Sequence, residues 1–117
     1  MTNTSPLEKD EQAAVIQYLE LRGHKFSAIP ADTGHTPEAR RRAVRMKRAG
    51  YRKGMPDLFC IVNGHAFFLE MKRVKNSTVS PEQKSWVKEI NTTEIRAYIA
   101  KGSEEAIAII EDYEGVL

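Results

Sequence analysis

The sequence predicts a mixed α/β domain in which a central β-sheet is flanked by helices. Two short apolar runs separated by Asn63 and Gly64 predict a β-hairpin, because both central residues of a tight type I′ turn need positive φ. On both sides of this hairpin, helix-like and strand-like segments alternate. We therefore expect the order α-β-α-β-β-α-β-α, with the last strand reached by a crossover helix. The 117 residues support a single domain, residues 1–117, with a modest core.

A first helix is expected over residues 7–21. Ser5 and Pro6 suit the N-cap and the first helical position, and the acids that follow favour the positive end of the helix dipole. Glu11 shares helical spacing with the apolar positions and therefore falls on or beside the buried stripe. An acid at this place is either a ligand in a site or a charge that stabilises the helix dipole. Glu8 is the alternative ligand.

A short strand over residues 25–30 and a polar loop precede a second helix, which is expected from Thr36 to about Gly50. Residues 39–56 contain eight lysines or arginines and no acid. Charges of one sign destabilise a helix unless an anionic ligand binds, so we expect a surface that binds a phosphate backbone. The basic residues assigned to this surface, two of which follow the hairpin, are Arg40, Arg41, Arg42, Arg45, Lys47, Arg48, Arg52, Lys53, Arg73 and Lys75.

The open end of the hairpin carries charged residues. A two-residue turn pairs Val62 with His65 and therefore sets Asp57 opposite Glu70, with Lys72 on the same face. Opposed carboxylates repel each other, so one of them takes up a proton unless a cation lies between them. Oxygen ligands in this arrangement suit Mg²⁺ or Mn²⁺. The simpler interpretation is that Asp57 only begins the strand and that Glu70 pairs with Lys72.

The rest of the hairpin is apolar on both faces, so we expect helices to cover both of them. The single cysteine, Cys60, lies in one apolar run and is expected to be a core residue without a reactive thiol. The face that continues from the charged end carries Phe59, Ile61, Ala66 and Phe68, and the opposite face carries Leu58, Cys60, Val62, Phe67, Leu69 and Met71.

Ser80 and Gln83 have the pattern of a capping box that opens a third helix over residues 81–91. Gln83 falls on the apolar face of this helix, so it can cap the helix or point into the cleft. A strand over residues 94–100 and a helix over residues 103–113 complete the chain.

Several function classes are excluded by missing motifs. The three histidines lack metal-ligand spacing, which argues against zinc, and no Walker loop or dinucleotide fingerprint suggests a nucleotide cofactor. No apolar run is long enough to span a membrane. The polar, acidic N-terminal segment also lacks the pattern of a signal peptide, so we expect a cytoplasmic protein.

Together these motifs resemble the PD-(D/E)xK nuclease core, and more closely its VRR-NUC group, the virus-type replication-repair nucleases. Gly-Met-Pro-Asp ends at Asp57, Glu-x-Lys runs from Glu70 to Lys72, and Ser-Pro-x-Gln ends at Gln83. An acid on the N-terminal helix, here Glu11, and a closing strand and helix complete the pattern. The resemblance covers nearly the whole chain and is closest to the small stand-alone members of phages and bacteria.

The resemblance implies a restriction-endonuclease-like fold and an endonuclease that hydrolyses DNA phosphodiester bonds with Mg²⁺ or Mn²⁺. Asp57 and Glu70 would hold the ion, together with the main-chain carbonyl of Met71 and with Glu11. Lys72 would orient or activate the attacking water.

Further implications of the resemblance concern the substrate and the assembly. Gln83 would support the site, and a homodimer acting in DNA repair on branched or four-way junction DNA is implied. The alternative is a non-catalytic DNA-binding or replication-accessory module that retains the fold. Such a module has no need of carboxylates facing an anionic backbone, so the intact acids favour the enzyme. A third hypothesis, a structural protein whose basic helix binds an acidic protein, leaves the acids unexplained.

Overall fold

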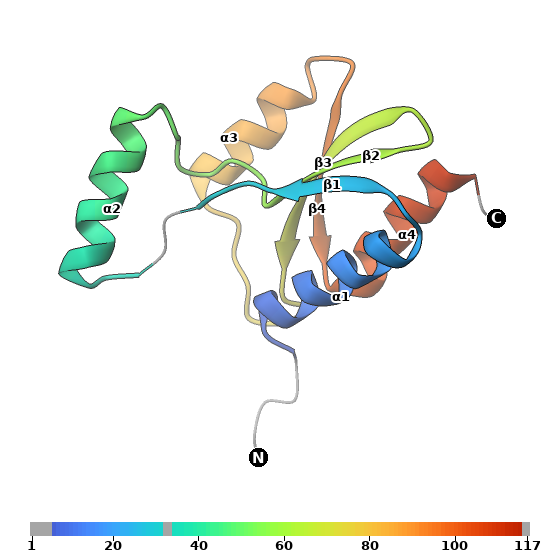
Figure 1. Ribbon diagram of the computed structural model, residues 1–117, viewed down its shortest axis with the longest axis horizontal. Helices are drawn as coiled ribbons and strands as arrows, with labels where there is room; N and C mark the ends of the chain where they lie inside the picture. Colours follow the sequence, from blue (N-terminus) through green and yellow to red (C-terminus); the bar gives the residue numbers. More distant parts are fainter. Residues whose placement is uncertain (1–5, 32–33, 116–117) are drawn as a thin grey trace.

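The computed structural model describes residues 6–31 and 34–115, and the predicted order of elements is confirmed (Figure 1). No helix in these ranges is long and apolar enough to cross a membrane. The elements are α1 (Glu8–Leu21), β1 (Lys25–Ala28), α2 (Pro37–Arg48), β2 (Leu58–Val62), β3 (His65–Lys72), α3 (Pro81–Ile90), β4 (Arg96–Lys101) and α4 (Ser103–Glu114).

The four strands form one mixed sheet in the order β1-β2-β3-β4. β2 and β3 form the predicted hairpin, in which Val62 pairs with His65, and Asn63 and Gly64 have φ of 52° and 80°. β1 is antiparallel to β2, whereas β4 is parallel to β3 and is reached through α3. The turn residues thus determine the register that the sequence predicts.

The core lies on the face of the sheet that α1 and α4 cover. Of the side chains of β2 and β3 that alternation directs to this face, all except that of His65, beside the turn, are fully buried. Burial of such apolar side chains is the main stabilising contribution to the fold. The fully buried core residues are Val15, Leu19, Leu58, Cys60, Val62, Phe67, Leu69, Met71, Ala100, Ala106 and Ile110.

The opposite face of the hairpin is only partly covered. Ile61 is 40% exposed, and Phe59 and Phe68 are half-buried, with ring centroids 5.1 Å apart. α3 packs against β4, at the edge of the sheet opposite β1. Within the described ranges, no helix covers β1 and β2 on this face. The expectation that helices cover both faces of the hairpin is therefore wrong.

Several element boundaries differ from the predictions by one or two residues, and β1, for example, ends at Ala28. α1 begins at Glu8 with Leu7 as its N-cap, and Ser5 lies outside the described residues. β4 begins two residues later than expected because a turn precedes it. The side chain of Asn91 accepts a hydrogen bond from the backbone N–H of Ala97 and donates one to its carbonyl, which holds this turn in place.

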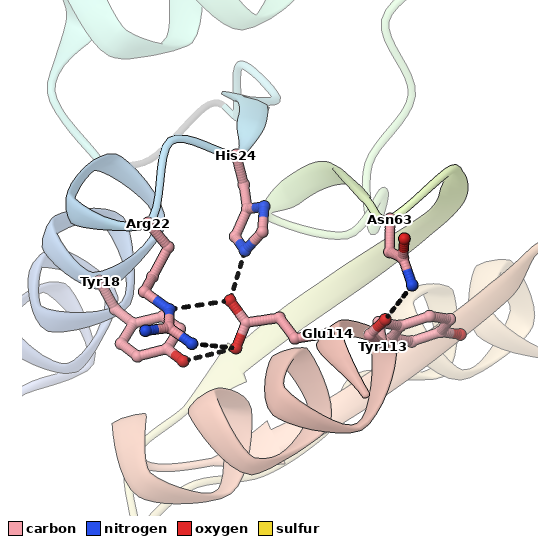
Figure 2. Close-up of polar contacts among 6 residues, drawn as sticks. All are labelled: Tyr18, Arg22, His24, Asn63, Tyr113 and Glu114. Carbon is pink, nitrogen blue, oxygen red and sulfur yellow. Dashed lines mark hydrogen bonds and ion pairs between the residues drawn. The ribbon is translucent and has the colours of Figure 1, made fainter. Parts of the chain in front are cut away.

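Glu114 attaches the end of α4 to the last turn of α1 and to the residues that follow it (Figure 2). The Tyr18 hydroxyl and the Arg22 guanidinium donate to its carboxylate at 2.7 and 3.1 Å, and Nε2 of His24 contacts the same group. The hydrogen bond from Arg22 is the largest of the effects that lower the pKa of Glu114 to about 2. Glu114 therefore remains ionised and joins the end of α4 to a segment about 90 positions earlier in the sequence.

Candidate metal centre

Three carboxylates meet at one end of the sheet. Glu8 is the first residue of α1, Asp57 directly precedes β2, and Glu70 lies near the end of β3. One carboxylate oxygen from each lies within 4.8 Å of those from the other two. The hairpin brings Asp57 and Glu70 together, and α1 adds Glu8 from the side.

Glu70 is the most enclosed member of this cluster, with 1% of its surface exposed. Its Oε2 accepts a hydrogen bond from Nε2 of Gln83 at 2.9 Å and lies 3.6 Å from Nζ of Lys72. Its Oε1 is buried and has no hydrogen-bond partner among the described residues. A buried carboxylate oxygen without a partner is costly, and a bound ion satisfies it.

Asp57 is oriented by the backbone of the neighbouring strand. The Met71 N–H donates to its Oδ2 at 2.7 Å, and its own carbonyl accepts the N–H of Ile29 at 2.8 Å. In a strand, the N–H and C=O of one residue point to the same side. By this pattern, the main-chain carbonyl of Met71 also points to the side of the strand on which Asp57 lies.

The pKa values of all three carboxyl groups are raised. Burial raises the pKa of Glu70 to about 8, and the charge of Asp57 adds to this effect. Burial is also the main cause for Asp57, although the Met71 N–H opposes it. The pKa of Glu8 is raised by burial and then by the charge of Asp57, and Lys72 lowers it. The charge of Asp57 therefore makes it harder for both glutamates to ionise.

This donor set fits a hard divalent cation. Carboxylate oxygens are the ligands that Mg²⁺ and Mn²⁺ prefer. Three carboxylates beside the single ammonium of Lys72 leave two negative charges to be neutralised. The partnerless oxygen of Glu70 and the raised pKa values indicate the same need for positive charge.

Gln83 both caps α3 and contacts the acid cluster. Its Oε1 accepts the N–H of Ser80, and its own N–H donates to the Ser80 hydroxyl oxygen, which completes the predicted capping box. Its Nε2 is left to donate to Glu70. The first turn of α3 therefore fixes the orientation of Glu70.

The loop before Asp57 is pressed against the same turn of α3. Gly54 has φ of +94°, and a Cβ there would lie 2.6 Å from the carbonyl carbon of Glu82. Nε1 of Trp86 donates to the carbonyl of Lys53 at 3.1 Å. Gly54 therefore allows the loop to approach the backbone of α3 closely.

Glu11 is not part of the acid cluster. Its carboxylate accepts hydrogen bonds from the N–H and the hydroxyl of Ser103, at the start of α4. Glu8, the alternative considered from the sequence, supplies the third carboxylate instead. Glu8 lies one turn earlier on the same side of α1, and this spacing is the sequence signal that identifies it. The structure therefore places Glu11 as a cap for another helix.

The predicted basic surface is centred on α2, which projects from the rest of the molecule (Figure 1). In the described part of the chain, α2 packs against no other helix or strand, and Ala39 is its one buried residue. Its basic side chains are therefore displayed on an exposed helix rather than around the carboxylates. The exposed basic residues of α2 are Arg40, Arg41, Arg42, Arg45, Lys47 and Arg48.

The remaining predicted basic residues lie in the loops around the cluster. Arg52 donates to the carbonyl of Lys47 at the end of α2, and Nε of Arg73 donates to the carbonyl of Pro6. Lys53 and Lys75 are exposed. These residues extend the positive charge from α2 toward the cluster.

Comparisons with known proteins identify the family. The VRR-NUC domain model matches residues 6–104. A solved structure described as a "VRR_NUC domain protein" is similar to the chain with a TM-score of 0.71 and 27% sequence identity, over 97% of this chain and 93% of that one. A comparison with curated protein sequences gives no match. Since the family match spans most of the sequence, the chain belongs to the VRR-NUC domain family and is a nuclease domain of the PD-(D/E)xK type.

Proposed function

We propose that this protein is a DNA endonuclease that requires Mg²⁺ or Mn²⁺ to hydrolyse phosphodiester bonds. The observation that carries the proposal is the cluster of Glu8, Asp57 and Glu70, whose oxygens converge within 4.8 Å beside a buried ammonium. A protein that only binds DNA gains nothing from carboxylates there, because they repel the phosphate backbone. A hydrolase needs such ligands.

Glu8, Asp57, Glu70 and the main-chain carbonyl of Met71 would hold the ion. When bound, the ion would polarise the phosphoryl oxygen and lower the pKa of a coordinated water. The chain's own residues orient these ligands: the Met71 N–H fixes the Asp57 carboxylate, and Gln83 fixes that of Glu70. Both hydrogen bonds leave one oxygen of each carboxylate available.

Lys72 is the catalytic cation in this proposal. Its side chain is 8% exposed and its ammonium lies 3.6 Å from Glu70, so it is held at the edge of the cluster. An ammonium in this position can donate a hydrogen bond to the attacking water and offset the charge that develops on the phosphate. The lysine thus assists hydrolysis, and the acids provide the ligands.

The basic side chains of α2 bind the DNA backbone in this proposal. Six arginines or lysines on one exposed helix repel each other, and phosphates relieve that repulsion. These contacts carry no sequence information, so we expect selection by DNA shape. From the family resemblance we propose a homodimer that cleaves branched or four-way junction DNA.

A cleavage assay tests the proposal. Duplex, flap, fork and four-way junction DNA are incubated with Mg²⁺, Mn²⁺ or a chelator, using the wild type, Asp57→Asn and Lys72→Ala. The matched control is Lys84→Ala, since Glu82-x-Lys84 repeats the Glu-x-Lys pattern on the exposed surface of α3. Sedimentation of the same preparations gives the oligomeric state.

We expect ion-dependent cleavage by the wild type and Lys84→Ala. Loss of cleavage in the other two variants should be about a hundredfold or more, with DNA binding retained by Lys72→Ala. Cleavage in chelator, or undiminished cleavage by Asp57→Asn, would rule out the proposed chemistry. Equal cleavage of every DNA structure would remove only the preference for branched DNA.

A further inference from the structure

Glu11 is a buried acid that the proposed reaction does not use. Its side chain is 6% exposed and accepts hydrogen bonds from the N–H and Oγ of Ser103 at 3.2 and 3.1 Å. Ser103 is the first residue of α4, and the N-cap residue Gly102 has no side chain to cap it. Glu11 therefore replaces an N-cap side chain for a helix that begins 92 positions away.

The same junction is joined to the strand that carries the acid cluster. The N–H of Gly102 donates to the carbonyl of Lys72 at 2.8 Å. A Cβ at Gly102, which has φ of +87°, would lie 2.9 Å from Oε2 of Glu11 and 2.7 Å from the side chain of Val74. The carboxylate thus lies directly against the glycine that follows β4. Through Gly102, it links α1 to the end of β3.

Among the residues that the structure describes, no side chain caps the first turn of α1. Leu7, the N-cap residue, provides no side-chain hydrogen bond, and uncapped helix ends tend to fray. Glu8 is the first residue of that turn, and Glu11 follows it at the spacing that places two side chains on one side of a helix. An anchor at Glu11 therefore limits the movement of Glu8.

We propose that Glu11 is a positioning residue. It holds α1 against the β4–α4 junction so that the carboxylate of Glu8 reaches Asp57 and Glu70. The inference rests on the proposed function, because its consequence is a complete set of ligands. Two competing explanations make different predictions: Glu11 as a ligand itself, and Glu11 as a contributor to stability alone.

The test measures Mn²⁺ binding by calorimetry, well below the unfolding temperature of each variant. The variants are Glu11→Ala, Glu11→Gln, Glu8→Gln and the double variant that combines Glu8→Gln with Glu11→Ala. Glu20→Ala is the matched control, since it removes an exposed glutamate from the same helix. Thermal unfolding without metal reports the loss of the cap separately.

We expect Glu11→Ala to weaken Mn²⁺ binding by about tenfold, as loss of a residue that orients a ligand commonly does. Glu11→Gln should restore most of the affinity, because the amide oxygen can still accept the hydrogen bonds from Ser103. In the Glu8→Gln background, Glu11→Ala should have no further effect on affinity. Glu20→Ala should bind Mn²⁺ like the wild type.

Three results would overturn the inference. Equal losses in Glu11→Gln and Glu11→Ala would identify Glu11 as a ligand. Unchanged affinity in Glu11→Ala would limit its role to stability. If Glu11→Ala weakened Mn²⁺ binding as much in the Glu8→Gln background as in the wild type, Glu11 would not act through Glu8. If Glu11→Ala does not fold, Ser103→Ala replaces it, with a smaller loss expected that is again absent in the Glu8→Gln background.

Failure of the proposed function would look different. In that case, Asp57→Asn would bind Mn²⁺ like the wild type, or the wild type would bind none, and both proposals would be rejected. Loss of binding in Asp57→Asn together with wild-type binding in Glu11→Ala would reject the positioning role alone.

Discussion

Glu70→Gln is expected to stabilise the metal-free protein at pH 8 while it abolishes metal binding. Burial and the charge of Asp57 raise the pKa of Glu70 from 4.5 to about 8. A folded-state pKa above the unfolded value means that folding favours the protonated acid. The resulting stability is fully present below pH 4.5 and is lost as the pH rises through about 8. A neutral amide of the same shape avoids that loss.

The size of the effect follows from linkage. Between pH 6 and pH 8, the protonated fraction of Glu70 falls from nearly complete to about one half, which lowers the free energy of unfolding by about 2 kcal/mol. For a domain of this length, such a change shifts the unfolding temperature by roughly 8 °C. Glu70→Gln should lack this contribution across the same interval.

Urea unfolding in the presence of chelator at pH 6, 7 and 8 provides the measurement. Glu82→Gln is the control, because it removes one exposed negative charge from a second Glu-x-Lys pair. Its pH dependence should match the wild type. The reasoning would be refuted if Glu70→Gln were less stable than the wild type at pH 8, or if both proteins showed the same pH dependence. Either result would mean that ionisation of Glu70 does not destabilise the folded protein. Mn²⁺ should then stabilise the wild type but not Glu70→Gln.

Three further predictions concern the surroundings of the cluster. Gly54→Ala should lose roughly 1–3 kcal/mol more stability than Gly50→Ala, since both have positive φ but only Gly54 touches the α3 backbone; equal losses in chemical denaturation would argue against this contact. Glu114→Gln should lose roughly 2 kcal/mol of stability at pH 7. The lowered pKa of Glu114 stabilises the wild type above pH 4.5, and this contribution is lost as the pH falls toward about 2, so the variant should lose less stability over that interval. The same loss of stability in both proteins between pH 4.5 and about 2 would contradict this. Replacing three α2 arginines by glutamine should lower the slope of log affinity for DNA against log salt by about 0.9 per lost contact. The three replaced residues are Arg41, Arg42 and Arg45. A slope equal to that of the wild type would locate the DNA-binding surface elsewhere.

The features that could be predicted from the sequence depend on short-range chemistry. Asn63 and Gly64 specify a tight turn, and the turn fixes the register that sets Asp57 near Glu70. The capping box at the start of α3 depends on residues three positions apart, so its hydrogen bonds were also predictable.

The features that could not be predicted depend on contacts between distant segments. Helical spacing places Glu11 on the buried side of α1 but does not reveal that Ser103 lies opposite it. The apolar pattern of β2 and β3 likewise cannot show that α3 packs over β4 and leaves Ile61 exposed. Local patterns thus determine which face a residue occupies, whereas tertiary packing determines what that face meets.

The most direct test of the account is anomalous diffraction from crystals grown with Mn²⁺. We expect an anomalous peak about 2.2 Å from carboxylate oxygens of Glu8, Asp57 and Glu70. The peak should disappear in Asp57→Asn crystals grown under the same conditions. Bound Mn²⁺ elsewhere on the molecule, with no peak between these three carboxylates, would contradict the central claim that they form one metal site.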